Sequence, residues 1–202
     1  MILYGASGHA KVIIDILIDN KINIDGLIDD NNQIEELLDY PVYHCLTKFN
    51  SVKNKSYIVS IGNNRIRKEI VAKLGDVKFG TVVHSSVILS PFVSLGVGVV
   101  VMHGSIINSS SKIGNHVIIN SRAVVEHDCL VGDYVHISPG AILCGNVKLE
   151  EGVWVGAGAT IKQGVTIGKW SVIGAGAVVI SDVPSNVVVA GVPSKLIKVH
   201  DV

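Results

Sequence analysis

A six-residue repeat constrains the fold of this chain more than any other feature of its 202 residues. Between Val83 and Val179, every sixth residue is a branched aliphatic side chain, without an exception, and a small or apolar residue follows each of them four positions later. Neither the 3.6-residue period of a helix nor the two-residue period of a simple strand explains this pattern. A hexapeptide period is typical of a parallel β-helix, in which each repeat forms a short strand and a corner.

Three such repeats close one triangular coil, so residues eighteen apart should lie on top of each other. The aliphatic positions then form a stack of inward-pointing rungs, which neighbouring coils bury. Glycines often follow a rung directly, as Gly96, Gly114 and Gly132 do, and others stand where corners are expected. Glycine adopts the unusual dihedral angles of a tight corner at little cost. The sequence therefore predicts a β-helix domain over residues 81–202, including a C-terminal tail.

The first eighty residues follow a different pattern. We expect strands at residues 2–4, 26–28 and 57–61, a helix at 10–20, and a second helix in which Ile66, Ile70 and Leu74 share one face. Residues 31–56 are rich in Asn and Lys and give no clear assignment. Strands that alternate with helices favour a small parallel sheet, so residues 1–80 are predicted to form a Rossmann-like α/β domain.

Three polar loops follow the three predicted strands: GASGH at residues 5–9, Asp29-Asp30, and GNN at residues 62–64. Ligands of open parallel sheets bind at the carboxyl ends of the strands, so these loops should converge on one crevice. The dinucleotide pattern G-x-G-x-x-G is not met, because the glycines here are Gly5 and Gly8. A single nucleotide therefore fits better than NAD, with a simple tight turn at GASGH as the alternative.

Composition limits the remaining classes of function. The chain has 17 basic and 17 acidic residues, which argues against a nucleic-acid surface. No apolar run approaches the length of a membrane span, and the start lacks the pattern of a signal peptide. Three cysteines without metal-ligand spacing, Cys45, Cys129 and Cys144, fit a reducing compartment. We expect a soluble, cytoplasmic protein.

The stretch VVEHDC at residues 124–129 places three ionisable side chains in an otherwise apolar ribbon. If Val125 and Cys129 point inward, His127 and Asp128 occupy an exposed corner, where a carboxylate can orient an imidazole that acts as a base. Gly145 stacks on His127 one coil later and offers a backbone N–H to an oxyanion. His136 lies half a coil further on, on another face, where it could reach His127 of a neighbouring chain. The alternative is a solvated corner without chemistry.

These motifs resemble those of a known family. YGASGH at 4–9, IDD at 28–30, SIGNNRIRKEI at 60–70, VVEHDC, SPGAILCGNV at 138–147 and AGVPSKLIK at 190–198 are similar to the bacterial sugar acyltransferases of the sialic acid O-acetyltransferase type. The PglD-type N-acetyltransferases of UDP-linked 4-amino-sugars are the most similar. The resemblance covers nearly the whole chain, and it also supplies the left hand of the β-helix.

The resemblance implies a homotrimer that transfers acetyl from acetyl-CoA to the 4-amino group of a nucleotide-linked sugar in glycan biosynthesis. It implies roles for residues of this sequence: His127 as general base, Asp128 to raise its basicity, His136, Ala157 and Ala175 to contact acetyl-CoA, and Ser7, Gly8, His9, Asp29, Asp30 and Gly62 to bind the nucleotide-linked sugar. Two departures from the family pattern are Ala10, where a second glycine is common, and Asp128, where glutamate also occurs.

Two other functions stay open at this point: O-acetylation of a sialic acid or another sugar hydroxyl, and a non-catalytic sugar-binding trimer. We expect no metal. Some β-helix trimers of the carbonic anhydrase kind hold zinc between chains, but the H-x4-H pair expected of them is missing. The remaining histidines are interpreted as structural: His44, His84, His103, His116 and His200.

Overall fold

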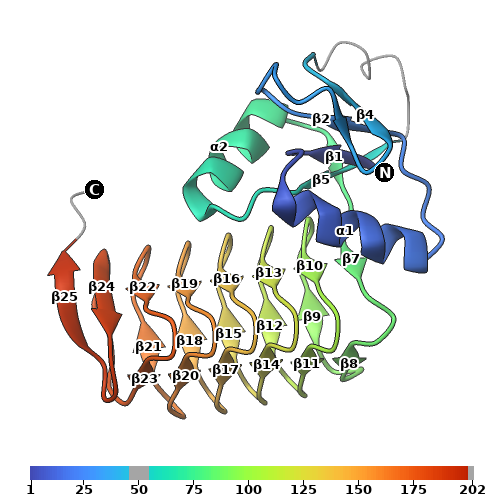
Figure 1. Cartoon of the computed structure of the whole chain (residues 1–202). Helices are drawn as coiled ribbons and strands as arrows, with labels where there is room; N and C mark the ends of the chain where they lie inside the picture. The colour runs from blue at the N-terminus through green and yellow to red at the C-terminus, as the bar shows by residue number, and fades with distance from the viewer. Residues whose placement is uncertain (46–54, 200–202) are drawn as a thin grey trace.

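A computed structural model describes residues 1–45 and 55–199 of the chain; His200 lies outside them. Figure 1 shows a small α/β domain that rests against one side of a β-helix, with the C-terminal strands at the far end of the coils. This confirms the predicted fold class. Within the described residues, no helix combines the length and apolar character that crossing a membrane requires.

The sheet of the first domain has the strand order β3-β4-β2-β1-β5-β6, and all of its neighbouring pairs are parallel except β3 with β4. Its strands are β1 (Ile2–Tyr4), β2 (Gly26–Ile28), β3 (Glu36–Leu37), β4 (Tyr40–Tyr43), β5 (Ser56–Val59) and β6 (Lys78–Phe79). The three predicted strands are present. Sequence reasoning missed β3, β4 and β6, because strands of two to four residues without a clear alternation carry too little periodicity to stand out.

Helix α1 (Gly8–Asp19) packs between this sheet and the β-helix. One buried cluster joins Ile13 and Leu17 of the helix, Leu3 of β1, and Val100 and Ile118 of the β-helix. A helix covered on two sides must be apolar around most of its circumference, which explains the sequence VIIDILI at residues 12–18.

Helix α2 (Asn64–Leu74) covers the other face of the sheet, where Ile70 and Leu74 are buried. Ile66 lies on the same side of the helix, as its spacing predicts, but it is 46% exposed and does not join them in the core. Arg67 is buried in its place. The helix contacts the β-helix as well as its own sheet, and Arg67 points toward that second boundary.

The β-helix is a triangular prism with three parallel sheets, which we call faces 1, 2 and 3. Face 1 contains β7 (Val82–Val83), β10 (Val100–Val101), β13 (Ile118–Ile119), β16 (His136–Ile137), β19 (Trp154–Val155), β22 (Val172–Ile173), β24 (Val187–Ala190) and β25 (Lys195–Val199). Face 2 contains β8 (Ile88–Leu89), β11 (Ile106–Ile107), β14 (Val124–Val125), β17 (Ile142–Leu143), β20 (Thr160–Ile161) and β23 (Val178–Val179). Face 3 contains β9 (Ser94–Leu95), β12 (Lys112–Ile113), β15 (Leu130–Val131), β18 (Lys148–Leu149) and β21 (Thr166–Ile167).

Strand pairing confirms the predicted eighteen-residue stacking. Val101 pairs with Ile119, and Ile119 with Ile137, on successive coils. In each two-residue strand the second residue is the inward rung, and these rungs are buried from Val101 onward. Only β25 departs from the parallel arrangement among the described strands of the prism, since it pairs antiparallel with β24.

From Gly98 to Gly176, each corner of the prism contains one residue with a left-handed backbone. These residues recur every six positions, with φ between 54° and 74°. Half of them are glycines, for which this region is cheap. The others are Ser110, His116, Arg122, Asp128, Tyr134, Asn146 and Trp170.

The first domain of the same chain covers the earlier coils of face 1. Val100 and Ile118 are each 1% exposed, because α1 packs on them. These two side chains are therefore not available to an apolar contact with another chain. The outward side chains of face 2 are uncharged, and several are apolar and accessible: Ile88 is 64% exposed and Ile142 is 38% exposed.

Candidate functional site

The three predicted loops meet at the carboxyl ends of β1, β2 and β5. Parallel pairing aligns Tyr4 with Ile28 and with Val59, so the loops that follow begin at the same edge. The Ser60 hydroxyl donates to the carbonyls of Tyr4 and Gly5 and ties two of these loops together. Parallel strands thus bring segments from three parts of the sequence to one edge, as predicted.

Asp29 and Asp30 diverge although they are adjacent. The Asp29 carboxylate accepts the N–H of Ala6 at 2.7 Å and that of Asn31 at 2.8 Å, so it shapes the GASGH loop. The Asp30 carboxylate accepts from the Tyr4 hydroxyl at 2.7 Å and from Lys73 of α2 at 2.9 Å. The Tyr4 hydrogen bond, followed by that of Lys73, lowers the Asp30 pKa. Asp29 therefore faces the predicted crevice, whereas Asp30 is joined to α2.

Arg67 is a buried residue that sequence reasoning missed. Its side chain is 1% exposed, and burial lowers its pKa to about 9. Its guanidinium donates to carbonyls of both domains: Ile61 at 3.0 Å, His116 at 2.9 Å and Tyr134 at 2.7 Å. No carboxylate pairs with it among the described residues. An arginine in a helix is usually exposed, so nothing in the pattern of α2 distinguishes it from Arg65.

Three histidines surround Arg67 at the boundary between the two domains. Burial, and secondly the Arg67 charge, lowers the pKa of His9 to about 4, of His116 to about 4 and of His136 to about 3. His136 Nδ1 is 3.1 Å from the Gly62 carbonyl oxygen, and its Nε2 is 3.1 Å from Asn120. The ring of His9 lies 6.0 Å from that of His136, and its Nε2 is buried without a partner in the described structure.

We expect acid to loosen this boundary. Because the folded-state pKa values lie below the ordinary value of 6.5, stability is intact above pH 6.5 and is lost as pH falls toward 4. His9 and His136 are the two more deeply buried of these histidines. Their depressed pKa values should each lower the free energy of unfolding by about 1–2 kcal/mol between pH 6.5 and pH 5. Urea unfolding followed by tryptophan fluorescence tests this. Equal stability at the two pH values would contradict it.

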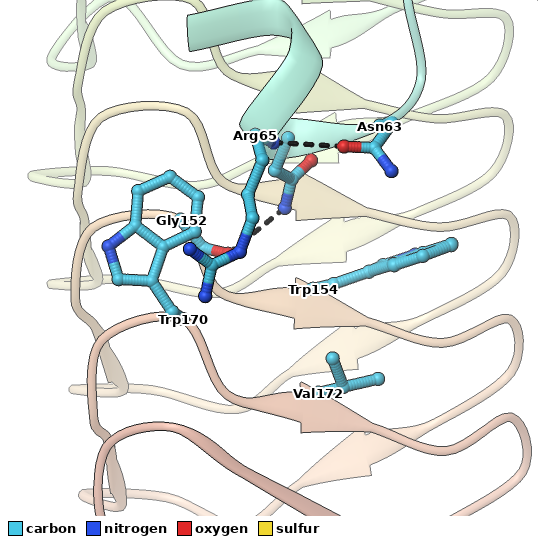
Figure 2. A pocket seen from close by; sticks show the side chains of 7 residues that line it. Asn63, Arg65, Gly152, Trp154, Trp170 and Val172 are labelled. Atoms are coloured by element: carbon cyan, nitrogen blue, oxygen red, sulfur yellow. Dashed lines mark hydrogen bonds between the residues drawn. The ribbon is translucent and has the colours of Figure 1, made fainter. Parts of the chain in front are cut away.

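A pocket opens between the start of α2 and the prism (Figure 2). It encloses about 190 Å³. The Arg65 guanidinium lies 4.9 Å from the ring centroid of Trp170, and the Asn63 side chain accepts the Arg65 N–H at 3.0 Å. The whole lining consists of Asn63, Asn64, Arg65, Gly152, Trp154, Trp170 and Val172. Sequence reasoning assigned no role to Arg65, Trp154 or Trp170. A single tryptophan, or one arginine on an exposed helix surface, gives no periodic signal.

A second groove continues along the prism from the other side of Trp154. It has a volume of about 320 Å³ and includes Ala157 and Ala175 on one edge, between faces 1 and 2. Gly176 donates to the Ala157 carbonyl at 2.8 Å, which confirms that these corners stack. The left-handed corner residues nearby, Gly158 and Gly176, have open space where a side chain would stand. This edge is therefore smooth and can accept an extended ligand.

His127 and Asp128 lie on the corner between β14 and β15. Their side chains are about half exposed, and His127 Nδ1 is 2.7 Å from Asp128 Oδ2. If Nδ1 carries the hydrogen of this contact, Nε2 carries the lone pair. Gly145 lies beneath the ring: a Cβ there would be 2.6 Å from both Cε1 and Nε2 of His127. The predicted neighbours are thus adjacent, and the missing side chain at Gly145 makes room for the imidazole.

The predicted residues form two groups on opposite sides of one chain. His136 of face 1 lies with His9 and Gly62 under the first domain. His127 lies on the edge between faces 2 and 3, which is opposite face 1 in a three-sided prism. Ala157 and Ala175 lie on the edge between faces 1 and 2. A single chain therefore does not bring His127 to the crevice.

Comparison with known proteins finds a matching family model in each of the two domains. Residues 1–74 match the family model of the PglD N-terminal domain. Residues 110–145 and 146–181 match that of the bacterial transferase hexapeptide, six repeats. An uncharacterised protein, L142 of Acanthamoeba polyphaga mimivirus, is 30% identical over 93 residues, which span 46% of this chain and only 19% of that protein.

Two solved structures are similar over nearly their whole length. PerB from Caulobacter crescentus, in complex with CoA and GDP-perosamine, is 36% identical with a TM-score of 0.93; the match covers 98% of this chain and 96% of that one. The acetyltransferase domain of PglB from Neisseria gonorrhoeae, in complex with acetyl coenzyme A, is 35% identical with a TM-score of 0.88, covering 97% and 98%. The chain belongs to the hexapeptide-repeat sugar N-acetyltransferases that carry a PglD-type N-terminal domain.

Proposed function

We propose that this protein transfers the acetyl group of acetyl-CoA to the 4-amino group of a nucleotide-linked amino-sugar. The observation that carries the proposal is the exposed His127–Asp128 pair, 2.7 Å apart, on a rigid corner. In the reaction the neutral amine attacks the thioester carbonyl carbon, so that a C–N bond forms and the C–S bond breaks. The amine loses one proton to His127 Nε2, and that proton then neutralises the departing thiolate of CoA.

Asp128 serves this step through its position. Its backbone has φ of 60°, a left-handed conformation that aspartate tolerates better than most residues. The corner directs its carboxylate to Nδ1 of the adjacent imidazole, where it fixes the tautomer and stabilises the imidazolium that forms. The N–H of Gly145, beneath the same ring, is the proposed donor to the oxyanion.

Gly145→Ala should damage the reaction without the loss of any functional side chain. The added Cβ would be 2.6 Å from the imidazole, so the ring of His127 must move. A displacement of this kind lowers kcat/KM by about 10²-fold where a group must be aligned with its substrate. Steady-state kinetics measures the effect, with Cys144→Ala beside it as the control. An unchanged kcat/KM in folded Gly145→Ala would contradict the proposed use of this corner.

Acetyl-CoA is assigned to the groove at Ala157 and Ala175. A pantetheine arm is long and narrow, and the smooth edge beside these residues would take it in an extended form. His136 was expected to contact acetyl-CoA as well. Its ring stacks on Trp154, 5.9 Å between centroids and 4° from parallel, and Trp154 lines the groove. His136 thus stands between the groove and the crevice, and we propose that it contacts the ligands where they meet.

The nucleotide-linked sugar is assigned to the crevice. Ser7 and Gly8 stand at the N-terminus of α1, where unpaired N–H groups and the helix dipole favour phosphate. His9 and Gly62 both lie against His136, and the Asp29 carboxylate holds the GASGH loop through the Ala6 N–H. Asp30 supports this region through Tyr4 and Lys73. The resemblance predicts UDP as the nucleotide, whereas the similar PerB structure contains a GDP-linked sugar. The activity assay should therefore include both UDP-linked and GDP-linked sugars.

We further propose a homotrimer, because the two groups of residues in one chain lie on opposite sides of the prism. Three-fold packing would bring His127 of one chain to the crevice of the next. The uncharged outward row of face 2 is the surface to bury: Ile88, Ile106, Val124, Ile142, Thr160 and Val178. Closed symmetry leaves no such surface exposed.

Ile142→Asp should dissociate this trimer. Its side chain is 38% exposed at the middle of the row, and a carboxylate buried there without a partner costs several kcal/mol. Analytical ultracentrifugation should detect monomers that are folded but inactive. Lys112→Glu, which adds negative charge to face 3 instead, is the matched control. A wild-type protein that is monomeric at micromolar concentration would overturn the shared site.

A thiol-release assay tests the function itself. Acetyl-CoA is offered with UDP- and GDP-linked 4-amino-sugars, with the same compounds carrying a hydroxyl in place of the amine, and with sialic acid. We expect thiol release and an acetylated product with the amines alone. Release with a hydroxyl compound only would favour O-acetylation. Binding of both ligands without release would favour a sugar-binding trimer.

A further inference from the structure

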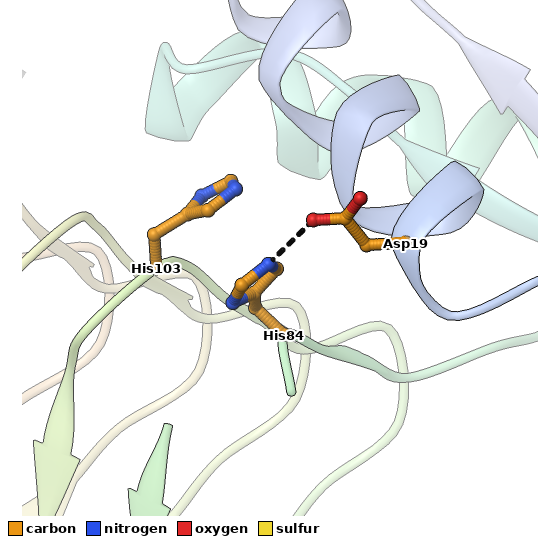
Figure 3. Close-up of side chains that lie close together, drawn as sticks. All are labelled: Asp19, His84 and His103. Atoms are coloured by element: carbon orange, nitrogen blue, oxygen red, sulfur yellow. Dashed lines mark hydrogen bonds and ion pairs between the residues drawn. The ribbon is translucent and has the colours of Figure 1, made fainter. Parts of the chain in front are cut away.

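Two histidines interpreted as structural come together with an aspartate at the boundary between the domains (Figure 3). Asp19 is the last residue of α1, His84 follows β7, and His103 lies one coil later. Their ligand atoms, one carboxylate oxygen and two ring nitrogens, all lie within 4.8 Å of one another. We propose that Asp19, His84 and His103 bind a divalent metal ion of the zinc class, which joins α1 to the first coils of the β-helix.

The donor set fits a borderline first-row cation. Two imidazoles and one carboxylate are a common zinc ligand set, and water can take the fourth position. His84 Nε2 and Asp19 Oδ2 are 2.9 Å apart, whereas two tetrahedral ligands of zinc are about 3.4 Å apart. The pair needs to open by only about 0.5 Å to admit the ion.

The second nitrogen of His84 is already supported from behind. Its Nδ1 is 2.6 Å from the Ser86 hydroxyl, which also accepts the N–H of Gly104 at 2.9 Å. Metal-binding histidines usually donate their other N–H to an oxygen in this way, which leaves Nε2 free for the metal. Without metal, the opposite tautomer donates Nε2–H to Asp19 and accepts the Ser86 N–H, 3.0 Å away. His84 therefore has a tautomer that is fully hydrogen-bonded without the metal ion and another that suits the metal-bound state.

The third proposed ligand is the imidazole of His103. The His103 ring packs against that of His84, with centroids 3.8 Å apart and planes tilted by 31°, and its nitrogens make no hydrogen bond in the described structure. Figure 3 shows the two imidazoles and the carboxylate around one space. Rotation of the half-buried His103 ring about its Cβ–Cγ bond directs a nitrogen into it. The Asp19 side chain is 55% exposed, so an ion can enter from solvent.

The position of Asp19 also favours a cation. An acidic residue in the last turn of a helix opposes the helix dipole, and α1 has no basic residue there to compensate. A bound cation reverses this repulsion. Asn20 holds the same end of α1 independently, because its side chain donates to the Val83 carbonyl at 2.7 Å. Variants of the three ligands should therefore stay folded.

Calorimetric titration of the EDTA-treated, full-length protein with ZnCl₂ tests the proposal. We expect one ion per chain and a higher melting temperature with Zn²⁺ than without. His103→Ala and Asp19→Asn should each weaken binding at least about tenfold, and Ser86→Ala by about 10–100-fold. Co²⁺ in place of Zn²⁺ should give a visible absorption band that His103→Ala abolishes.

His127→Ala is the control, because His127 is an exposed histidine beside a carboxylate in another part of the chain. It should bind zinc as the wild type does. Binding that is lost in His127→Ala, or retained in full by His103→Ala, would place the ion elsewhere and overturn the site. Absence of binding at micromolar Zn²⁺ would leave these three side chains as a hydrogen-bonded contact only, and it too would overturn the proposal.

Discussion

His127→Ala should lower kcat/KM by about 10²–10⁴-fold, the usual cost of losing a positioned general base. The Gly145 N–H beneath the imidazole is a donor and cannot take up the proton in its place. Most of the loss should appear in kcat, since residues other than His127 are proposed to bind the two substrates. Steady-state kinetics with both substrates varied measures it.

The variant should also keep its fold, because His127 is exposed and is not a rung of the core. Asp128→Asn keeps the shape of the corner but removes the charge, and we expect a smaller loss than in His127→Ala. Wild-type turnover by a folded His127→Ala protein that binds acetyl-CoA would contradict the mechanism. The corner would then be the solvated turn that the sequence alone left open.

Arg67→Met should destabilise the protein by at least about 3 kcal/mol. The substitution removes every donor that joins the carbonyls of Ile61, His116 and Tyr134 across the domain boundary. Each buried carbonyl left without a partner costs about 1–3 kcal/mol. Urea unfolding measures the change, and both tryptophans, Trp154 and Trp170, lie at this boundary, so their fluorescence reports it.

Arg65→Met is the matched control, two residues earlier in the same helix. Arg65 is exposed and contacts the face of Trp170, an interaction worth about 0.5–1 kcal/mol. If the two variants lose equal stability, Arg67 does not hold the domains together. Arg67→Lys should lie between them, because one ammonium cannot reach all the acceptors of the planar guanidinium.

The contrast between these two arginines indicates how far the sequence could be interpreted. The hexad repeat predicted the prism, its rungs and the stacking of Gly145 on His127, because each depends on spacing along one chain. The contacts of Arg67, the burial of Val100 and Ile118 and the meeting of Asp19 with two histidines depend on how the first domain packs on face 1. No periodicity encodes that packing, since the residues involved are distant in sequence.

The loops of the first domain lie between these cases. Their convergence was predictable from the parallel sheet, but the separate roles of Asp29 and Asp30 were not. Adjacent residues of an extended segment point to opposite sides, and which side faces α2 depends on the packing of Tyr4 and Lys73. Trp154 and Trp170 were missed for a similar reason, because each acquires its role only from the opposing α2.

Because the left-handed corners recur every six residues, the effect of an insertion or deletion in the prism depends on its length. Removal of one hexapeptide would keep every rung apolar, so the protein should still fold. It would, however, rotate every later corner to the next edge, and His127 would no longer point to the side opposite the first domain. Removal of eighteen residues would preserve the edge and change only the height. Variants that keep activity should therefore differ in length by whole coils of eighteen residues. A change of a single hexapeptide should preserve the fold but not the activity.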